Sequence, residues 1–430
     1  MATPFDHLVE LRRRLRVLLV VEQLRRRVPG GVGTYARSLV SGLVGLAEPL
    51  PVEVVLFASG YRRRQSRSAE SVEESGNGGD PLWEFGLAVE ESKLSSRLLT
   101  RAWDHDLIAA PKGFSIVHSV SMAFPKIRSS RRDDVTGREA LVVSVHDLAW
   151  RRLLGSTTRR GHSWHEGALR RAIRSAQALV VPSDEVARDL SEAGVREDRI
   201  RVITEGADHL PAPDIQGARS LLADHGVDGE YILSVGTLEP RKNLARLIDA
   251  HAIASTRLGG GVRLVVVGPR GWGPRDVVDR STSYSGLVKH DRTSSKTASE
   301  VVYLGGVAAG TLAGLYALAR TFVYVPLAEG YGLPPLEAMR SSVPVVVSSE
   351  VPSVKYRIGD CMPGDETDPR RRVALSVNPI DVEEIADAIV VASSDEVIRH
   401  ELIGAARQMV SKRTWKRCAL EHVDIWESFR

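Results

Sequence analysis

The sequence predicts an α/β protein made of two domains, each built on a parallel sheet. At 430 residues the chain is longer than one hydrophobic core usually supports, and at roughly 100 to 200 residues per domain it suggests two. Short apolar runs alternate with helical stretches, a pattern typical of strands buried on both faces of a parallel sheet. The pattern restarts in the second half, which indicates two similar domains with a deep cleft between them.

The expected strands form two series, separated by a linker. The segment 206–220 contains glycine and prolines and has no apolar periodicity, so we place the boundary near residue 212. This division predicts an N-terminal domain over 1–212 and a C-terminal domain over 213–412. Two polar stretches, 59–81 and 280–300, are expected to be loops. The predicted strands are 15–21, 52–58, 115–120, 140–147, 178–183 and 200–204, then 231–237, 263–268, 301–306, 321–326 and 343–349.

Composition excludes several classes of protein. Hydrophobic residues make up 43% and charged residues 26%, which is ordinary for a globular protein. The only cysteines, Cys361 and Cys418, exclude a disulfide framework and a thiolate metal site, and fit a reducing cytoplasm. The apolar run 15–21 is too short to cross a membrane. With 5% aromatic residues and no stacking or zinc-finger pattern, nucleic-acid binding is not indicated.

Basic residues come in short runs, although the net charge is only +4. Such runs could contact an anionic bilayer, which would place a cytoplasmic protein at the inner face of the cell membrane. An arginine-rich composition along the whole chain accounts for the same runs without any membrane role. The runs are Arg12 to Arg14, Arg25 to Arg27, Arg62 to Arg64 and Arg370 to Arg372.

A glycine-rich stretch follows the first expected strand. Gly30, Gly31 and Gly33 form the predicted turn into an amphipathic helix with apolar residues at 35, 39, 40 and 43. Free N–H groups at such a helix start can bind an anion, but a plain tight turn is an equally good reading. The stretch also matches the dinucleotide fingerprint G-x-G-x-x-A. A nicotinamide enzyme requires an acid at the end of the second strand, where this chain has Ala-Ser-Gly.

Two cations occupy an unfavourable place in the second half. Arg241 and Lys242 come just before a predicted helix that carries Leu244, Leu247 and Ile248 on one face. The helix dipole favours acids at its N-terminus, so a bound anion would explain the two cations, while a solvated surface pair would need none.

Two glutamates flank a turn rich in glycine and proline. "TFVYVP" reads as a buried strand, "AEGYGLP" as the loop at its carboxyl end and "PLEAMRSS" as a helix with proline in its first turn. This reading places Glu329 at the strand end and Glu337 in the first helical turn. Ligands of parallel sheets bind at the carboxyl ends of the strands, so both carboxylates are expected to point into one site.

With these features the sequence resembles the retaining glycosyltransferases of family 4, which have the GT-B fold. The resemblance rests on the E-x7-E stretch "EGYGLPPLE", the "PGGVGTY" turn, the "GTLEPRKN" loop and the segment "VVYLGGV...LAGLYALA" over 301–319. These motifs occur in the order of the family and span about residues 15 to 425. In the family the last helix returns to the first domain, which implies this position for 413–430.

The resemblance implies roles for particular residues. Glu329 would bind donor-sugar hydroxyls and Glu337 the ribose, while Arg241 and Lys242 would hold the diphosphate. His146 would stand beside the donor sugar. Family members often have arginine where this chain has Thr237, which weakens the diphosphate assignment. The remaining implied donor-binding residues are Gly30, Gly31, Thr237, Gly306, Val307, Gly330, Tyr331, Gly332 and Leu333.

The implied reaction is transfer of a hexose from a nucleoside diphosphate sugar, with retention, to a glycan or lipid-linked acceptor in polysaccharide assembly. Fixed cations and N–H donors meet the charge that develops on the leaving phosphate, so neither a metal nor a cofactor is expected. "GTLEPRKN" with "SVHDL" is most similar to bacterial mannosyl- and rhamnosyltransferases, which favours GDP-mannose. The alternatives are a UDP-glucose-type donor, a synthase or phosphorylase with a soluble sugar acceptor, and a catalytically silent nucleotide-sugar-binding subunit.

Several other polar patterns have structural explanations. Asp104 and Asp106 spell D-x-D, but they lie in a helical stretch rather than after a strand, so a metal role is not expected. His162 and His165 lie on a predicted amphipathic helix without a third ligand. His146 could equally be a core histidine at a strand end. The last helix is expected to bury Trp415, Cys418, Leu420, Val423 and Trp426.

Overall fold

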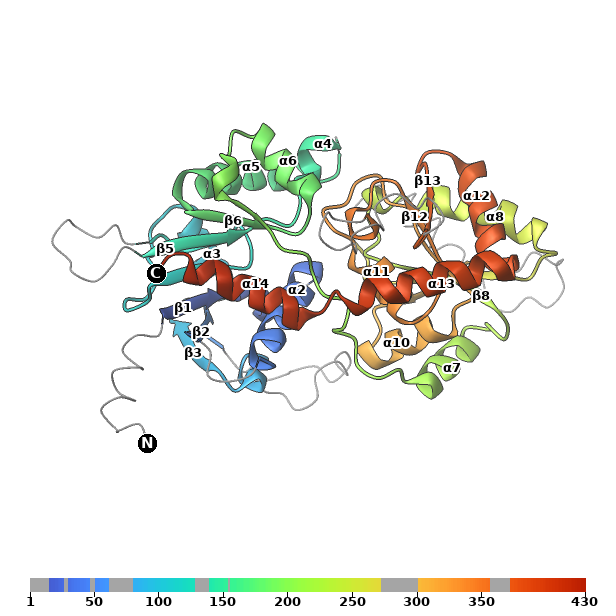
Figure 1. Cartoon of the computed structure of the whole chain (residues 1–430), viewed down its shortest axis with the longest axis horizontal. Coiled ribbons are helices and arrows are strands. Elements are labelled where there is room, and N and C mark those ends of the chain that lie inside the picture. Colours follow the sequence, from blue (N-terminus) through green and yellow to red (C-terminus); the bar gives the residue numbers. More distant parts are fainter. Residues whose placement is uncertain are drawn as a thin grey trace. The chain divides into compact units, whose positions relative to one another are not determined.

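The computed structural model of the chain divides into two compact units (Figure 1). One unit comprises Met1–Leu148, Arg159–Gly206 and Trp415–Arg430, and the other comprises Ala149–Thr158 and Ala207–Thr414. Most of both predicted polar loops, most of the basic runs and Cys361 lie outside the described residues. The structure describes residues 15–26, 30–46, 51–61, 80–127, 139–153, 155–271, 301–355 and 372–430.

The first unit contains a seven-stranded sheet in which neighbouring strands are parallel. Its order is β3-β2-β1-β4-β5-β6-β7. All six strands predicted for this half are confirmed, whereas β3 was missed because "AVEES" is polar and lies at an edge. The strands are β1 Leu15–Val20, β2 Val52–Ser59, β3 Ala88–Ser92, β4 Ile116–Ser119, β5 Ala140–Ser144, β6 Ala178–Val181 and β7 Ile200–Val202.

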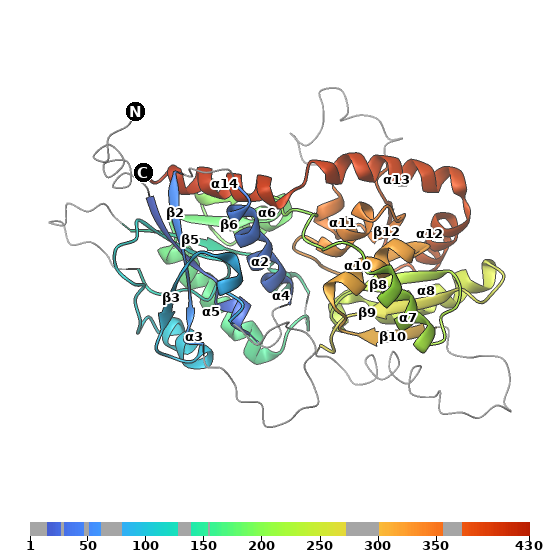
Figure 2. The same ribbon diagram turned by 90° about the horizontal axis from the view of Figure 1, so that it is seen from below.

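Helix α14, Trp415–Glu427, packs beside α2, Gly30–Val44, although the two are almost 400 positions apart in the sequence (Figures 1 and 2). A Cβ at Gly42 would lie 2.5 Å from the carbonyl oxygen of Trp415, so glycine permits this close approach. The expected buried stripe of α14 is confirmed except at Leu420, which is exposed; His422 is buried instead. The other helices of this unit are η1 Glu22–Arg25, η2 Trp83–Phe85, α3 Ser96–Asp104, α5 Arg159–Ser175, α6 Asp184–Glu192 and η3 Glu197–Arg199.

The second unit contains a six-stranded parallel sheet in the order β10-β9-β8-β11-β12-β13. The five predicted strands are confirmed, and the short edge strand β13 was missed. Central strands β8 and β11 are neighbours, so the loops at their carboxyl ends start side by side. The strands are β8 Tyr231–Val235, β9 Arg263–Val267, β10 Val301–Gly305, β11 Thr321–Tyr324, β12 Val345–Ser348 and β13 Leu375–Val377.

The core of the second unit forms where α8 and α12 cover the sheet. Leu247 and Ala250 of α8 meet Ile385 and Ile389 of α12 in one buried cluster. Among the described residues, none of the helices combines the length and the apolar composition that a bilayer crossing requires. The helices of this unit are α4 Ala149–Arg152, α7 Ile215–Asp224, η4 Pro240–Lys242, α8 Leu244–Arg257, α10 Ala309–Leu318, α11 Leu333–Arg340, η5 Pro352–Val354, α12 Val382–Ser394 and α13 Glu396–Ser411.

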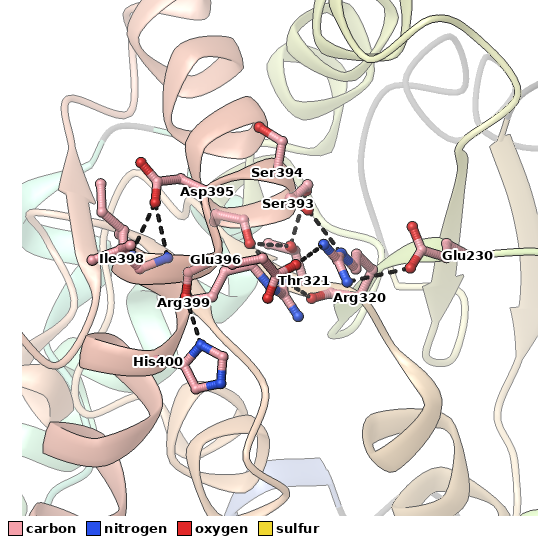
Figure 3. Close-up of polar contacts among 12 residues, drawn as sticks. Glu230, Arg320, Thr321, Ser393, Ser394, Asp395, Glu396, Ile398, Arg399 and His400 are labelled. Carbon is pink, nitrogen blue, oxygen red and sulfur yellow. Dashed lines mark hydrogen bonds and ion pairs between the residues drawn. The ribbon is translucent and has the colours of Figure 1, made fainter.

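The corner between α12 and α13 is fixed by polar side chains (Figure 3). Asp395 caps α13 by accepting the N–H groups of Val397 and Ile398 at 3.0 and 3.1 Å. Arg320 donates to the carbonyl of Ser393 at 2.7 Å. Arg399 donates to the carbonyl of Ala392 at 2.6 Å. These bonds satisfy carbonyls that a helix end otherwise leaves unpaired, which stabilises the turn from one helix into the next.

Candidate active site

The loop between β11 and α11 carries Glu329. The helix begins at Leu333 with proline in its first positions, and its N-cap Gly332 has φ +100°. A Cβ on Gly332 would lie 2.7 Å from Cγ1 of Val351, so only glycine fits this turn. Glu329 therefore lies in the loop beyond the strand end, and Glu337 lies past the first turn of α11 rather than within it. The expectation for Glu337 is corrected by about one position, while Glu329 lies as expected in the loop at the carboxyl end of β11.

Arg241 and Lys242 lie on the short turn η4 that precedes α8. Asn243 separates η4 from α8 in the left-handed conformation, with φ 60°, which asparagine tolerates better than most residues. Its side-chain N–H₂ donates to the carbonyls of Val325 and Pro379 at 3.0 and 2.6 Å. This buried amide ties the cationic turn to the residue directly after β11.

Glu329 receives hydrogen bonds on both carboxylate oxygens. Arg241 donates from Nη1 to Oε1 at 3.1 Å, and Lys242 donates from Nζ to Oε2 at 2.5 Å. The Tyr324 hydroxyl donates to Oε2 at 2.6 Å. Arg241 also pairs with Glu239 at 2.7 Å. The structure thus brings three predicted residues, Glu329, Arg241 and Lys242, into one cluster, and the alternative of a solvated cation pair is wrong.

The cluster of Glu329, Arg241 and Lys242 is charged and largely buried. Burial alone raises the pKa of the Glu329 carboxyl, but the charges of Lys242 and Arg241 hold it well below its usual range. Burial, together with the charge of Arg241, lowers the pKa of the Lys242 ammonium, against the opposing effect of Glu329. Burial and the Glu329 charge raise the pKa of Tyr324 well above its ordinary value, so its hydroxyl remains a donor.

Glu337 has a separate set of partners. Tyr316 of α10 donates its hydroxyl to Oε2 at 2.6 Å, and His209 donates from Nε2 to Oε1 at 2.8 Å. Only 7% of Glu337 is exposed. Burial and the Glu337 charge raise the pKa of Tyr316 well above its usual value. The two glutamates therefore belong to one loop-helix segment but are held by different side chains.

The remaining predicted residues of the second unit lie on three loops. Gly330, Tyr331, Gly332 and Leu333 are buried in the segment between the two glutamates. Thr237 follows β8 and is half-buried. The loop that contains it packs closely on Gly268, where an added Cβ would lie 2.1 Å from the carbonyl oxygen of Gly236. Gly306 and Val307 follow β10, the first exposed and the second half-buried.

Three predicted residues belong to the first unit and are placed only within it. Gly30 and Gly31 are exposed, and the structure corrects the separate glycine turn: the helix is assigned from Gly30 itself, with φ +61°. His146 donates from Nε2 to the Val120 carbonyl at 2.8 Å, and its Nδ1 lies 3.8 Å from Glu205. Burial lowers the pKa of His146, but Glu205 outweighs it and raises the pKa overall.

Behind His146 lies a buried network that sequence reasoning did not find. The Tyr35 ring meets the His146 ring edge-on with centroids 4.6 Å apart. The network contains Tyr35 Oη–His422 Nε2 at 2.8 Å, Tyr35 Oη–Ser144 Oγ at 3.2 Å, Ser144 Oγ–His118 Nε2 at 3.1 Å and Trp426 Nε1–His118 Nδ1 at 3.0 Å.

Two donors at the ends of this network fix the direction of every hydrogen bond in it. Trp426 can only donate, so His118 carries its proton on Nε2 and donates to Ser144. The Nδ1–H of His422 donates to the carbonyl of Cys418 at 2.7 Å, which leaves Nε2 to accept from Tyr35. Ser144 then donates to Tyr35, and every group is satisfied with both histidines neutral.

The D-x-D pattern has structural partners. Asp104 ends α3 and accepts the indole N–H of Trp164 at 3.0 Å and a contact from Arg171 at 3.5 Å. His162 is exposed and His165 half-buried on α5. Within the described part of the chain, no three His, Cys, Asp or Glu side chains cluster as metal ligands would.

Sequence reasoning missed several side chains that hold the predicted glutamates or their segment, among them Tyr316, Tyr324, His209 and Arg413. Tyr316 and Tyr324 were visible as lone hydroxyl-bearing residues in otherwise apolar stretches, "LAGLYALA" and "TFVYVP". His209 lay in the supposed linker, and Arg413 lay just before the last helix; neither position carries a local signal.

Comparison with known proteins gives two matching families. The family described as "Glycosyltransferase Family 4" matches residues 29–209, and "Glycosyl transferases group 1" matches residues 223–409. Escherichia coli O-antigen chain mannosyltransferase B is 31% identical over 200 residues, which are 46% of this chain and 45% of that protein. The E. coli serotype-specific mannosyltransferase WbdA is 30% identical over 249 residues, 57% of this chain and 26% of that protein.

The chain thus spans less than half the length of these curated relatives. Among solved structures, Anabaena HepE in complex with UDP-glucose matches with a TM-score of 0.65 at 16% identity, over 96% of this chain and 100% of that one. The structural likeness concerns the fold, and the two family matches together span most of the sequence. The chain belongs to the family 4 glycosyltransferases, and its two parallel-sheet units are those of the GT-B fold.

Proposed function

We propose that this protein is a retaining hexosyltransferase that moves a hexose from a nucleoside diphosphate sugar to a glycan or lipid-linked acceptor. The observation that carries the proposal is the cluster of Glu329 with Arg241 and Lys242. Mannosyltransferase relatives at about 30% identity support mannose, and hence GDP-mannose, as the donor to test first.

The cluster has the groups that phosphate departure needs. When a sugar leaves a nucleoside diphosphate, negative charge develops on the phosphate oxygen, and fixed cations stabilise it. Arg241 and Lys242 are partly reached by solvent, with side chains 18% and 15% exposed. Without a ligand their charges are matched by Glu239 and Glu329. A diphosphate would replace part of this pairing, and the two side chains would supply the positive charge without a metal ion.

Glu329 is proposed to bind the donor sugar rather than to attack it. Both its oxygens already accept hydrogen bonds, and its lowered pKa keeps it ionised beside two cations. A carboxylate held in this way is a weak nucleophile but a good acceptor for sugar hydroxyls. A same-face displacement, in which the leaving phosphate helps to deprotonate the acceptor, needs no protein nucleophile and leaves Glu337 for the ribose.

The roles of the first unit remain part of this proposal. His146 would contact the donor sugar, Gly30 and Gly31 would approach the diphosphate, and the acceptor would bind nearby. In the structure His146 uses Nε2 on the Val120 carbonyl, so contact with a sugar requires exchange of that bond. Placement at the inner face of the cell membrane likewise remains a prediction.

A panel of nucleotide sugars tests the proposal. We expect GDP-mannose to stabilise the protein against unfolding, by about 2.7 kcal/mol at 100 times its Kd. Lys242→Met should remove the stabilisation, whereas Lys416→Met, which changes an exposed lysine of α14, should not. Glu329→Gln should lower turnover by about 100-fold, as loss of a group that acts in the transition state does.

The outcomes separate the parts of the proposal. Stabilisation by UDP-glucose but not GDP-mannose would replace the donor and keep the function. Unchanged turnover of Glu329→Gln would remove Glu329 from the mechanism. Absence of any response across the panel, with the protein folded, would overturn the proposed function.

A further inference from the structure

The chain passes between the two units four times, and beside the last two passages lie residues that contact the segment carrying the two glutamates. The third passage, at Gly206 and Ala207, and the fourth, at Thr414 and Trp415, are called here the first and second connections. The two are joined by a main-chain hydrogen bond from the N–H of Ala207 to the carbonyl of Arg413 at 2.9 Å.

At the second connection, Arg413 is a buried residue at the end of the second unit. Arg413 is only 3% exposed, and its Nη1 donates to the Tyr331 hydroxyl at 3.3 Å and to the carbonyl of Ser353. Nη2 donates to the carbonyl of Lys355 at 3.2 Å. A buried guanidinium is costly unless its N–H groups are used, and these contacts use both terminal nitrogens, mainly on the turn around Ser353.

The turn η5, Pro352–Val354, holds the 329–337 segment through hydrogen bonds from Ser353. The N–H of Ser353 donates to the Tyr331 carbonyl at 2.9 Å, and the Ser353 hydroxyl donates to the Gly332 carbonyl at 2.6 Å. Gly332 has a positive φ, a conformation that needs such outside support to persist. Arg413 therefore fixes Tyr331 directly and Gly332 through Ser353.

At the first connection, His209 makes the matching contact. Its Nε2 donates to Oε1 of Glu337 at 2.8 Å, and both side chains are less than a tenth exposed. The carboxylate that the family resemblance assigns to the ribose is thus oriented by a residue of the connecting segment and not only by Tyr316 of α10.

We propose that His209 and Arg413 are positioning residues through which two of the four connections between the units, those at Gly206–Ala207 and Thr414–Trp415, hold the 329–337 segment in its ligand-binding geometry. Connecting residues absorb the backbone changes of any rearrangement between units, so these contacts would transmit such changes to Tyr331 and Glu337. The identity of the ligand rests on the proposed function, but the positioning itself does not.

Hydrogen exchange without ligand tests the positioning directly. We expect Arg413→Met to speed amide exchange in a peptide covering 326–340 by about tenfold, the effect of losing one buried hydrogen bond. Arg407→Met is the matched control, because Arg407 lies on the neighbouring helix α13 and contacts Ser342 at an exposed site. Exchange in this peptide should be unchanged in the control.

Substitution at His209 provides a second, independent readout. His209→Ala should raise the KM for GDP-mannose about tenfold with a smaller change in kcat, because it loosens a binding group. His209→Gln retains an N–H donor and should restore most of the affinity. If Arg413→Met fails to fold, the His209 variants decide.

The inference and the proposed function can fail separately. Unchanged exchange in Arg413→Met and unchanged KM in His209→Ala, with both proteins folded, would overturn the positioning role. A wild-type protein that binds no nucleotide sugar would overturn the proposed function, while the exchange comparison between Arg413→Met and Arg407→Met would still decide the positioning.

Discussion

One buried polar cluster from each unit invites comparison, because the two satisfy their polar groups in opposite ways. In the first unit, Tyr35, His118 and His422 form a neutral network in which each donor meets one acceptor. In the second unit, Glu329 is ionised between two cations. Buried polar groups must be satisfied, and the chain does this once with hydrogen bonds alone and once with charge.

The difference indicates which cluster can exchange partners with a ligand. His118, His422 and Trp426 are entirely buried, so their network has no access to solvent and serves to join α14 to the sheet. Arg241 and Lys242 remain partly exposed, and their carboxylate partners can be replaced by another anion. The closed neutral network is structural support, whereas the charged cluster is the site that we propose for an anionic ligand.

The largest expected effect comes from removing the central charge of the second cluster. Glu329→Leu leaves Lys242 without its carboxylate partner and Arg241 paired with Glu239, and loss of one partner from a buried pair costs about 3 to 5 kcal/mol of unfolding free energy. Denaturant unfolding measures the change. Glu383→Leu is the control, because Glu383 pairs with Arg257 at an exposed site where ion pairs contribute little. Equal stability of the two variants would show that the cluster is not electrostatically coupled.

A smaller effect is expected from breaking the neutral network. Tyr35→Phe removes the hydroxyl that joins Ser144 to His422 and leaves buried acceptors unpaired, which costs about 1 to 3 kcal/mol. Hydrogen exchange over 415–427 should report the loss locally. Tyr231→Phe is the comparison, because this buried hydroxyl of the second unit donates to one carbonyl, that of Leu315. A larger cost at Tyr231 would contradict the view that the Tyr35 network is cooperative.

Much of the fold could be predicted because most of its strands have a clear sequence pattern. Central strands of a parallel sheet are buried on both faces and read as continuous apolar runs, which is why β1, β8 and β11 were found. β3 and β13 lie at the edges of their sheets, where one side of the strand is unpaired and the sequence is free to be polar or short. These two edge strands were missed for this physical reason, whereas the edge strands β7 and β10 have largely apolar sequences and were predicted.

The candidate site was predictable where its residues follow strands that can be recognised in the sequence. Arg241 with Lys242 and the Glu329 loop follow neighbouring strands, so their meeting follows from sheet order alone. His209 and Arg413 could not be found in this way, because their partners Glu337 and Tyr331 are remote in the chain. The exposure of Leu420 on α14 could not be predicted either, because the apolar pattern favours a buried leucine, whereas in the structure His422 is buried and Leu420 is exposed.

Acidification separates the two clusters, because a lowered pKa at a histidine reduces folding stability as the pH falls, whereas a lowered pKa at a carboxylate contributes stability above the unfolded pKa. Burial lowers the pKa of His422 to about 4 and the pKa of His118 well below its usual value. Below about pH 6.5 the unfolded chain binds protons at these histidines that the folded chain does not, so folding stability falls. Glu329 has a lowered pKa, so the stability it contributes is lost only below its unfolded pKa, about 4.5, and stays constant between pH 7 and 5.

Between pH 7 and pH 5, His422 alone should therefore cost the first unit about 2 kcal/mol, at about 1.4 kcal/mol for each pH unit below 6.5. His146 opposes this loss, because its raised pKa adds stability below 6.5 that disappears as the pH rises through its folded value. His422→Gln keeps an acceptor for Tyr35 and should lose about 2 kcal/mol less than wild type over this range, by hydrogen exchange of 415–427. His225→Gln, at an exposed site of the second unit, should behave as wild type. An identical pH response of His422→Gln and wild type would mean that the network accepts a proton, and the contrast between a neutral and a charged cluster would not hold.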